Sequence, residues 1–301
     1  MREITIAGRR IADDEPCYVI AELGHNHGGN LATAEDLIVS AASCGVDAVK
    51  LQKRDNQHLY TSALLNKPYD NENSYGPTYG AHREALEFGL HEYNVCTDVA
   101  TRAGVTCFAT AFDEASADFL MNIGTPAIKL SSGSLTDLRL IDYVARLGVP
   151  VLLSTGGGTL HDISRAVECL EAQTMDFAIL HCTASYPCAF EELNLEMIPV
   201  LRELLPDTVI GWSGHDSGIA MASVAYTLGA RIIEKHFTLN RAMKGTDHAF
   251  SLEPSGMTKM VRDLDRCRVA LGDGVKRVYD SELAPIAKMR RHETPEGWKI
   301  G

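Results

Sequence analysis

The chain has 301 residues, of which 45% are hydrophobic, and carries a formal net charge of -12. This length allows a large core, either in one barrel-sized domain or in two smaller ones. The diffuse acidic charge argues against nucleic acid and anionic membranes as partners, although it does not exclude an anionic small substrate. No apolar run reaches the roughly 20 residues that span a bilayer, and the N-terminus lacks a signal-peptide core, so we expect a cytoplasmic protein.

Eight short apolar runs, rich in β-branched residues, alternate along the chain with segments of helical periodicity. Strands that are almost continuously apolar and alternate with helices are typical of a parallel sheet covered by helices. Eight such units favour a closed (β/α)8 TIM barrel of the α/β class, with an open doubly wound sheet as the alternative. The predicted strands span 18–22, 47–52, 105–110, 126–131, 150–155, 177–183, 208–213 and 231–237.

We expect one domain, a barrel over 1–275, followed by a tail over 276–301 that forms a short helix and then frays. The connection from 53 to 80 is long, polar and aromatic, and we expect it to overhang the barrel mouth because such loops are usually functional. The eight cysteines lack CxxC spacing. We interpret them as buried free thiols, with a catalytic Cys182 or Cys188 as the alternative.

Polar residues end nearly every predicted strand. In a barrel of this kind the carboxyl ends of the strands line the active site, so these side chains are expected to face the mouth. The residues at these ends are Glu22, Lys50, Gln52, Lys129, Ser131, Ser154, Ser213, His215, Glu234 and His236.

Lys50 and Lys129, with nearby serines, form a group of cations and hydroxyls that suits a phosphate or a carboxylate. The glycines at 156–158 leave backbone N–H groups free to approach an anion. For each lysine the alternative is a salt bridge at the barrel end. The serines in this group are Ser132, Ser154 and Ser213.

His215 and His236 end the last two strands, where two imidazoles can share a divalent metal and leave positions for water and substrate. The alternative is a hydrogen-bonded pair without metal. His181, in mid-strand, is better interpreted as an interior hydrogen-bonded histidine. Glu22 and Glu234 are candidate acid–base groups, or else the partners that neutralise buried lysines.

The loops after the first and last strands add further candidates. In ELGHNHGG, a loop histidine such as His25 is usually solvated, but we expect Asn26 and His27 to point at the mouth. Asp247, after the last strand, is a candidate for binding substrate hydroxyls or the water on a metal.

Several motifs, taken in order over residues 16–272, closely resemble those of the sialic acid (N-acetylneuraminate) synthase family. The resemblance implies a metal-dependent condensation of phosphoenolpyruvate with the open-chain aldehyde of a sugar, which releases phosphate and gives a 2-keto-3-deoxy sugar acid. The motifs are IAELGHNHGGN, AVKLQ, ENSYGPTYG, AIKLSSGSLTDL, PVLLSTGG, LHCTASYP, GWSGHDSG and EKHFTLNRAMKGTDHAFSLEP.

The same resemblance implies roles for individual residues. His215 and His236 match the ligands of the family's divalent metal, typically Mn²⁺, with Mg²⁺ or Co²⁺ as alternatives. Glu22 and Glu234 match carboxylates at the mouth. The aldose partner is implied to be N-acetylmannosamine or a similar sugar, and the chain is expected to form a homodimer. Phosphoenolpyruvate contacts match Lys50, Lys129, Ser132, Ser154 and Ser213, and sugar-side positions match Gln52, Asn73, Thr110, Tyr186 and Asp247.

Two departures from the family pattern affect the expected substrate. The family has a KxxS motif, here KLSS at 129–132, and usually carries a carboxylate two residues after its serine, on the substrate side. In this chain that position is Ser134. The family's C-terminal antifreeze-like domain is also absent from the chain, so we expect either a different aldose or a separate chain that supplies this module. Two alternative functions stay open: a pyruvate-type aldolase, which releases no phosphate, and a non-catalytic sugar-binding or partner subunit.

Overall fold

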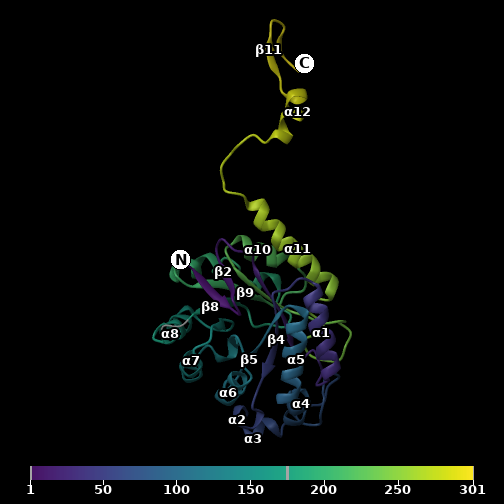
Figure 1. Ribbon diagram of the computed structural model, residues 1–301, viewed down its shortest axis with the longest axis vertical. Coiled ribbons are helices and arrows are strands. Elements are labelled where there is room, and N and C mark those ends of the chain that lie inside the picture. The colour runs from purple at the N-terminus through teal and green to yellow at the C-terminus, as the bar shows by residue number, and fades with distance from the viewer. Residues whose placement is uncertain (1, 174–175, 301) are drawn as a thin grey trace. The chain divides into compact units, whose positions relative to one another are not determined.

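The computed structural model describes residues 2–173 and 176–300 (Figure 1). Its centre is a closed barrel of parallel strands in the order β10-β3-β4-β5-β6-β7-β8-β9, so the last strand pairs with the first. The prediction of a single TIM-type barrel is therefore confirmed, and the open sheet is excluded. The strands lie within one or two residues of their predicted bounds: β3 (Tyr18–Gly24), β4 (Ala48–Lys53), β5 (Thr106–Ala111), β6 (Ile128–Leu130), β7 (Val151–Ser154), β8 (Phe177–Cys182), β9 (Val209–Gly214) and β10 (Ile232–His236).

Helices follow the strands and lie outside them, as Figure 1 shows for α1, α5, α6, α7 and α8. Each of these helices lies in a segment between two strands where the sequence shows helical periodicity. The helices of the barrel are α1 (Leu31–Ser43), α2 (Asn56–Leu59), α3 (Ser62–Leu65), α4 (Tyr79–Leu86), α5 (Leu90–Ala103), α6 (Glu114–Asn122), α7 (Leu138–Ala145), α8 (Leu160–Glu171), α9 (Met197–Leu204), α10 (Ala220–Thr227) and α11 (Pro254–Leu271), with 3-10 turns η1 (Ser132–Ser134) and η2 (Phe190–Glu192).

Helix α1 illustrates how the sequence sets these bounds. The side chain of Asn30 caps the helix by accepting a hydrogen bond from the N–H of Thr33 at 3.0 Å. Gly45 then adopts a φ of 85°, which a residue with a Cβ rarely adopts, and turns the chain into β4. Between them the buried side chains recur every three or four residues and pack against the barrel: Ala34, Leu37, Ile38 and Ala41.

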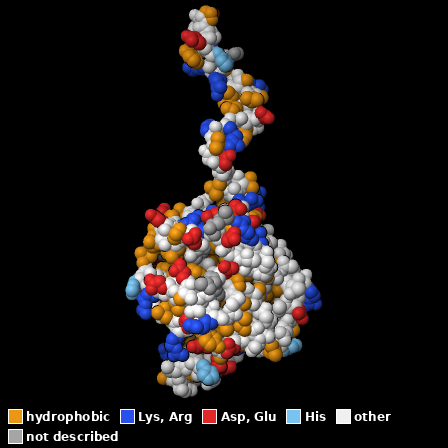
Figure 2. Space-filling view, turned by 60° about the vertical axis from the view of Figure 1, so that its left-hand side comes forward, with side chains coloured by type: hydrophobic (Ala, Val, Ile, Leu, Met, Phe, Trp, Pro, Cys, Tyr) orange, Lys and Arg blue, Asp and Glu red, His pale blue; other side chains and the backbone are white. Residues whose placement is uncertain are grey.

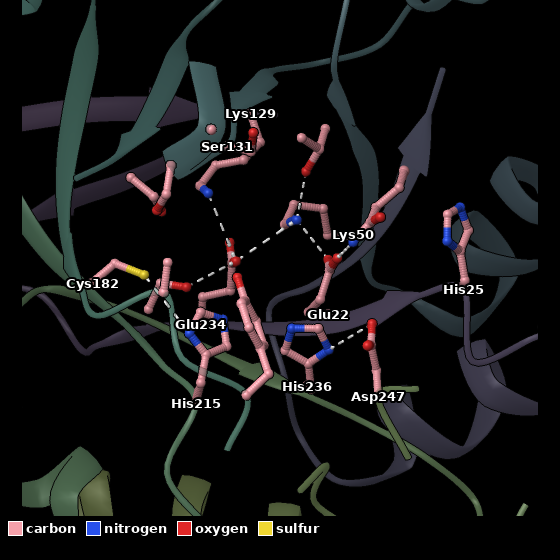
Figure 3. Close-up of a pocket in the computed structure, with 18 of the residues that line it drawn as sticks. Glu22, His25, Lys50, Lys129, Ser131, Cys182, His215, Glu234, His236 and Asp247 are labelled. Atoms are coloured by element: carbon pink, nitrogen blue, oxygen red, sulfur yellow. Dashed lines mark hydrogen bonds and ion pairs between the residues drawn. The ribbon is translucent and has the colours of Figure 1, made fainter. Parts of the chain in front are cut away.

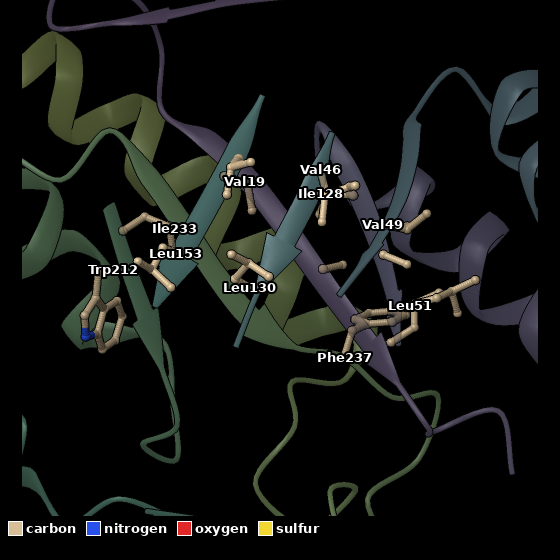
Figure 4. Packing of buried hydrophobic residues seen from close by; sticks show 14 of the residues in the cluster. Val19, Val46, Val49, Leu51, Ile128, Leu130, Leu153, Trp212, Ile233 and Phe237 are labelled. Carbon is tan, nitrogen blue, oxygen red and sulfur yellow. The ribbon is translucent and has the colours of Figure 1, made fainter. Parts of the chain in front are cut away.

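The hydrophobic core has two layers that follow from the alternation of side chains along each strand. Outward side chains such as Val19, Val49, Leu130 and Leu153 pack in the layer between strands and helices (Figure 4). Inward side chains at the starts of the strands form a second cluster inside the barrel. Its strand residues are Tyr18, Ile20, Ala48, Phe108, Leu152, Ala178, Leu180, Val209 and Ile232.

A hairpin that the sequence analysis does not predict precedes the barrel. Strands β1 (Glu3–Ile6) and β2 (Arg9–Ala12) pair antiparallel. Their side chains Ile4, Ile6 and Ile11 are buried in the same cluster as the inward residues at the strand starts. The hairpin therefore closes the amino end of the barrel, and the opposite end is the one open to ligands.

The long connection from 53 to 80 contains α2 and α3 rather than irregular chain alone. It reaches the loop that follows β10, because the Tyr75 hydroxyl donates to the Lys244 carbonyl at 2.6 Å and the Asn73 side chain accepts from the Gly245 N–H at 3.0 Å. This loop also carries Asp247. The connection therefore lies beside the mouth, although none of the described residues 55–80 lines the pocket there.

The chain divides into two compact units, residues 1–267 and 268–301, against the boundary expected at 275. The second unit holds the expected short helix, α12 (Asp280–Met289). A hairpin of β11 (His292–Thr294) and β12 (Gly297–Lys299) stands where the sequence predicts a frayed end.

Over residues 2–173 and 176–300, the structure contains no helix whose length and apolar character would allow it to cross a membrane. Acidic and basic side chains are interspersed on the face seen in Figure 2, so the net charge of -12 does not gather there into a field of one sign.

Candidate active site

The inward side chains change character along each strand. In β4 the inward Ala48 is followed by Lys50 and Gln52, and in β10 the inward Ile232 is followed by Glu234 and His236. Apolar residues therefore fill the lower barrel and polar residues gather at the carboxyl ends of the strands, where active sites of this architecture lie.

These polar ends surround a pocket of about 310 Å³ (Figure 3). The pocket is lined by most residues that the sequence predicts for the site, and every barrel strand contributes to it. The predicted residues in its lining are Glu22, Lys50, Gln52, Thr110, Lys129, Ser132, Ser154, Tyr186, Ser213, His215, Glu234, His236 and Asp247.

Two lysines and two glutamates form the centre of the pocket. Nζ of Lys50 lies 2.6 Å from Oε2 of Glu22 and 3.7 Å from Oε1 of Glu234. Nζ of Lys129 lies 3.8 Å from the same Glu234 oxygen. The four side chains are almost fully buried, so their charges act on one another with little screening by water.

The pKa values of the two carboxyl groups shift in opposite directions. Burial raises the pKa of Glu22, although the ammonium group of Lys50 opposes the shift. Burial acts in the same direction on Glu234, but the nearby Lys129 and Lys50 outweigh it and lower the pKa of that carboxyl. Glu234 is thus the ionised partner of both lysines, while Glu22, with its raised pKa, is the carboxyl better suited to exchange a proton.

Burial also lowers the pKa of Lys129, against the attraction of Glu234. Hydroxyl groups complete this side of the pocket. The hydroxyl of Ser132 accepts a hydrogen bond from the Gly156 N–H at 2.9 Å, and the hydroxyl of Ser213 donates to Glu234 at 3.2 Å. The hydroxyl of Ser154 is buried without a hydrogen-bond partner among the described residues, so it is available to a ligand.

The two predicted histidines lie together at the pocket wall, with ring centroids 5.3 Å apart. Burial lowers the pKa of His215 to about 3 and that of His236 to about 4, so both imidazoles are neutral. The Thr183 carbonyl lies 3.1 Å from Nδ1 of His215, which places the proton on Nδ1 and the lone pair on Nε2. Nδ1 of His236 is buried without a hydrogen-bond partner among the described residues.

Neutral imidazoles with a carboxylate nearby are a donor set that divalent first-row metals accept, and Oδ2 of Asp247 lies 3.7 Å from Nδ1 of His236. These residues fit such a metal. In the described parts of the chain, however, no group of three His, Cys, Asp or Glu side chains is arranged to hold a metal ion. The two histidines would therefore share the metal with water or substrate.

A third group of polar atoms lies around Gly24, whose φ is 51°. A Cβ at Gly24 would lie 3.2 Å from Oε1 of Glu22, 3.2 Å from Nε2 of Gln52 and 3.7 Å from Oδ2 of Asp247. The absence of a side chain at Gly24 therefore leaves space where these three groups converge. The ring centroid of Tyr186 lies 4.2 Å from that of His215.

Four residues that the sequence places at the mouth do not line the pocket. Asn73 is bonded to the loop after β10, and Ser134 is buried in η1 with its hydroxyl 3.4 Å from that of Ser131, so neither lines the pocket. Asn26 donates to the Phe237 carbonyl at 2.8 Å. His27 stacks on Phe88, with ring centroids 3.9 Å apart.

His181 is the interior histidine that the sequence predicts, since its Nε2 lies 2.8 Å from the Leu193 carbonyl in the buried interior. All eight cysteines are free, as predicted, but only five are buried, since Cys107, Cys169 and Cys267 are partly exposed. Cys182 nevertheless lines the pocket, and burial raises the pKa of its thiol, which disfavours the reactive thiolate.

Three charged or titratable pocket residues are missing from the predicted site: His25, Arg54 and Arg83. Arg54 follows Lys50 and Gln52 with the same spacing of two, so an extension of the inward pattern would have found it. His25 lies in the loop where the sequence favours Asn26 and His27. Arg83 lies on α4, and no strand pattern points to it.

A closed barrel with buried lysines, carboxylates and histidines at the carboxyl ends of its strands is the architecture of an enzyme rather than of a binding scaffold. Residues 37–276 match the NeuB family, and the chain belongs to that family.

Similar proteins are named synthases of nonulosonic acids. The human N-acetylneuraminate-9-phosphate synthase is 34% identical over 96% of this chain and 82% of its own length. The N,N'-diacetyllegionaminic acid synthase of Legionella pneumophila is 32% identical over 92% of this chain and 80% of its own length. The crystal structure of N-acetylneuraminic acid synthetase from Leptospira borgpetersenii, in complex with citrate, is similar with a TM-score of 0.83 and 31% identity over 95% of each chain. The chain is thus an enzyme of the sialic acid synthase type.

Proposed function

We propose that the protein condenses phosphoenolpyruvate with an open-chain aldose to give a 2-keto-3-deoxy sugar acid and phosphate. The observation that carries this proposal is the pair of buried ammonium groups, Lys50 and Lys129, that converge on one oxygen of Glu234. Two cations held in one buried pocket suit a small molecule that carries both a phosphate and a carboxylate.

The lysine side of the pocket is assigned to phosphoenolpyruvate. Lys50 and Lys129 supply positive charge. The hydroxyls of Ser132, Ser154 and Ser213, which line the same pocket, supply hydrogen-bond donors. Because the pocket is buried, these groups hold the anion with little competition from water and fix the orientation of its C3 carbon.

The side around Glu22, Gln52 and Asp247 is assigned to the aldehyde end of the sugar, since their polar atoms converge around Gly24. In the reaction, C3 of phosphoenolpyruvate bonds to the aldehyde carbon and the aldehyde oxygen gains a proton. Water adds at C2, and the C2–O bond to phosphate breaks. In this proposal Glu22 holds and transfers the proton at the sugar oxygen, a role that its raised pKa supports.

His215 and His236 would hold a divalent metal, with Mn²⁺ as the first choice and Mg²⁺ or Co²⁺ as alternatives. When bound, such a metal supplies a Lewis acid for the aldehyde oxygen, worth several kcal/mol of charge stabilisation. The cytoplasmic location and the homodimer stay predictions.

The names of the relatives leave the sugar open, because they include both a free acid and its 9-phosphate. The test is phosphate release from phosphoenolpyruvate in the presence of a panel of aldoses, N-acetylmannosamine among them, with the product identified by mass spectrometry. The proposal expects one equivalent of phosphate for each new sugar acid. Carbon–carbon bond formation from pyruvate without phosphate would support the aldolase instead, and ligand binding without turnover would support the non-catalytic subunit.

A further inference from the structure

Two arginines and a histidine form a separate group in the pocket, here called the arginine cluster: His25, Arg54 and Arg83. His25 lies in the loop after β3, Arg54 directly follows β4, and Arg83 lies on helix α4. Figure 3 shows His25 at the opposite side of the pocket from Lys129 and Cys182, with Glu22 between. His25 of this cluster is therefore set apart from Lys129, one of the two lysines assigned to phosphoenolpyruvate.

Arg54 is buried and firmly positioned. Its guanidinium stacks on the Phe112 ring at 3.6 Å, and Nη2 donates to the Gln52 side chain at 2.7 Å. Its ion-pair partner is Glu87, whose Oε1 lies 3.9 Å from Nη1 of Arg54. The other oxygen of Glu87 already accepts from Lys53 at 3.2 Å, and Nε of Arg54 is buried without a partner among the described residues.

Arg83 approaches from the side of α4. Its Nε donates to the Tyr79 hydroxyl at 2.9 Å, and its guanidinium lies 4.9 Å from the centre of the same ring. The remaining contact is from Nη1 to Nδ1 of His25, at 3.4 Å. Within the described parts of the chain these contacts are all with uncharged groups, so the positive charge of Arg83 is not neutralised by direct contact.

His25 lies between the two guanidinium groups. Nε2 is 3.0 Å from Nη1 of Arg54, and Nδ1 faces Nη1 of Arg83. Burial, together with the charges of Arg54 and Arg83, lowers the pKa of His25 well below its ordinary value. A neutral imidazole accepts one hydrogen bond only, whereas a guanidinium can only donate. One of the two arginines therefore faces an N–H group and lacks an acceptor.

An anion with several oxygens would supply the acceptors that this arrangement lacks. We infer that the arginine cluster binds a phosphate monoester on the aldose, so that the preferred acceptor is a sugar phosphate rather than a neutral sugar. The inference rests on the proposed function, because it assigns the sugar end of the same pocket. The planar guanidinium groups of Arg54 and Arg83 match phosphate oxygens in geometry as well as in charge.

The test measures kcat/KM of the purified, metal-supplemented full chain for N-acetylmannosamine and for its 6-phosphate, at saturating phosphoenolpyruvate. We expect the phosphorylated sugar to be preferred by about 10- to 100-fold, the effect of one or two charge-assisted hydrogen bonds. A wild-type preference for the neutral sugar, or equal values, would overturn the inference.

The half-buried Arg83 is the residue to vary, since it can be replaced with less risk to the core than Arg54. Arg83→Met should reduce the preference ratio by about 10-fold or more, and Arg83→Lys should keep part of it. Arg139→Met, on the exposed face of α7, is the matched control and should keep the wild-type ratio. An unchanged ratio in Arg83→Met would contradict the assignment, and so would a rise in KM for phosphoenolpyruvate larger than the change in the ratio.

Failure of the proposed function can be recognised separately. If no aldose supports phosphate release, titration calorimetry with mannose 6-phosphate still tests the arginine cluster. Binding that Arg83→Met weakens by about 10-fold would uphold the phosphate site without the condensation reaction. Absence of binding would overturn both.

Discussion

Nζ of Lys235 lies 2.8 Å from Oδ1 of Asp216, and both side chains are almost fully buried outside the barrel lumen. Lys235 directly precedes His236, and Asp216 directly follows His215. Lys235 also donates to the Asp216 carbonyl at 2.7 Å. The ion pair thus ties the ends of β9 and β10 together and fixes the spacing of the two histidines in the pocket.

Removal of one partner from this pair should destabilise the protein strongly. Lys235→Met leaves the Asp216 carboxylate buried without its cation, which costs about 3–5 kcal/mol of the free energy of unfolding. Urea denaturation followed by circular dichroism measures the loss. The double variant with Asp216→Asn should lose less than the sum of the two single variants, whereas strict additivity would show that the two side chains do not interact.

The barrel could be predicted from the sequence because each strand is an apolar run that ends in polar residues. Because side chains alternate along a strand, Lys50 and Gln52 both point inward from β4. Glu234 and His236 likewise both point inward from β10. This reasoning fails where the chain leaves the strand. After Gly24, with its φ of 51°, alternation no longer says which side chain faces the mouth, so the sequence does not distinguish His25 from His27.

Other residues escaped the prediction for different physical reasons. Ser134 lies in η1, where the period of two no longer applies. Arg83 reaches the pocket only because α4 packs beside the mouth, which is a tertiary contact with no local signal. The β1–β2 hairpin did leave a signal, the alternating Ile4 and Ile6, but the run is short and precedes the regular strand–helix pattern.

Replacement of Lys129 should weaken the binding of phosphoenolpyruvate. Lys129→Met keeps the length of the side chain but removes the ammonium group, and we expect KM for phosphoenolpyruvate to rise by about 10- to 100-fold. Initial rates of phosphate release measure the effect. Lys259→Met, an exposed lysine on α11, is the control and should behave as wild type. An unchanged KM in Lys129→Met would refute the anion role of this lysine.

Removal of divalent metal should abolish turnover. We expect EDTA to stop phosphate release and Mn²⁺ to restore it, because the neutral His215 and His236 suit a metal. His215→Ala should lose bound metal and activity but keep its circular dichroism spectrum, whereas His161→Ala, an exposed histidine on α8, should lose neither. A chelated wild-type enzyme that kept its full rate would contradict the metal assignment.

The buried His27 should make the protein sensitive to acid. Burial lowers the pKa of His27 to about 3, so the folded state stays unprotonated at pH values where the unfolded chain binds a proton, with a pKa near 6.5. The stabilisation is fully present above about pH 6.5 and is lost as the pH falls toward 3. His27→Phe keeps the stacking on Phe88 but removes this titration.

Urea denaturation of wild type and His27→Phe at pH 7 and at pH 4 measures the difference. The wild type should lose on the order of 3 kcal/mol more than the variant over this interval. Equal losses in the two proteins would show that His27 is not the group responsible.

Glu234 serves both lysines of the pocket, with one oxygen 3.7 Å from Lys50 and 3.8 Å from Lys129. The protein therefore carries an internal counter-ion, and any incoming anion has to compete with a carboxylate that is already in place. Such competition lowers the affinity for every small anion, including the phosphate that the proposed reaction would release. In the proposed reaction, departure of phosphate would restore the original pairing of Glu234 with the two lysines. We therefore expect the same carboxylate that weakens anion binding to limit inhibition by this product.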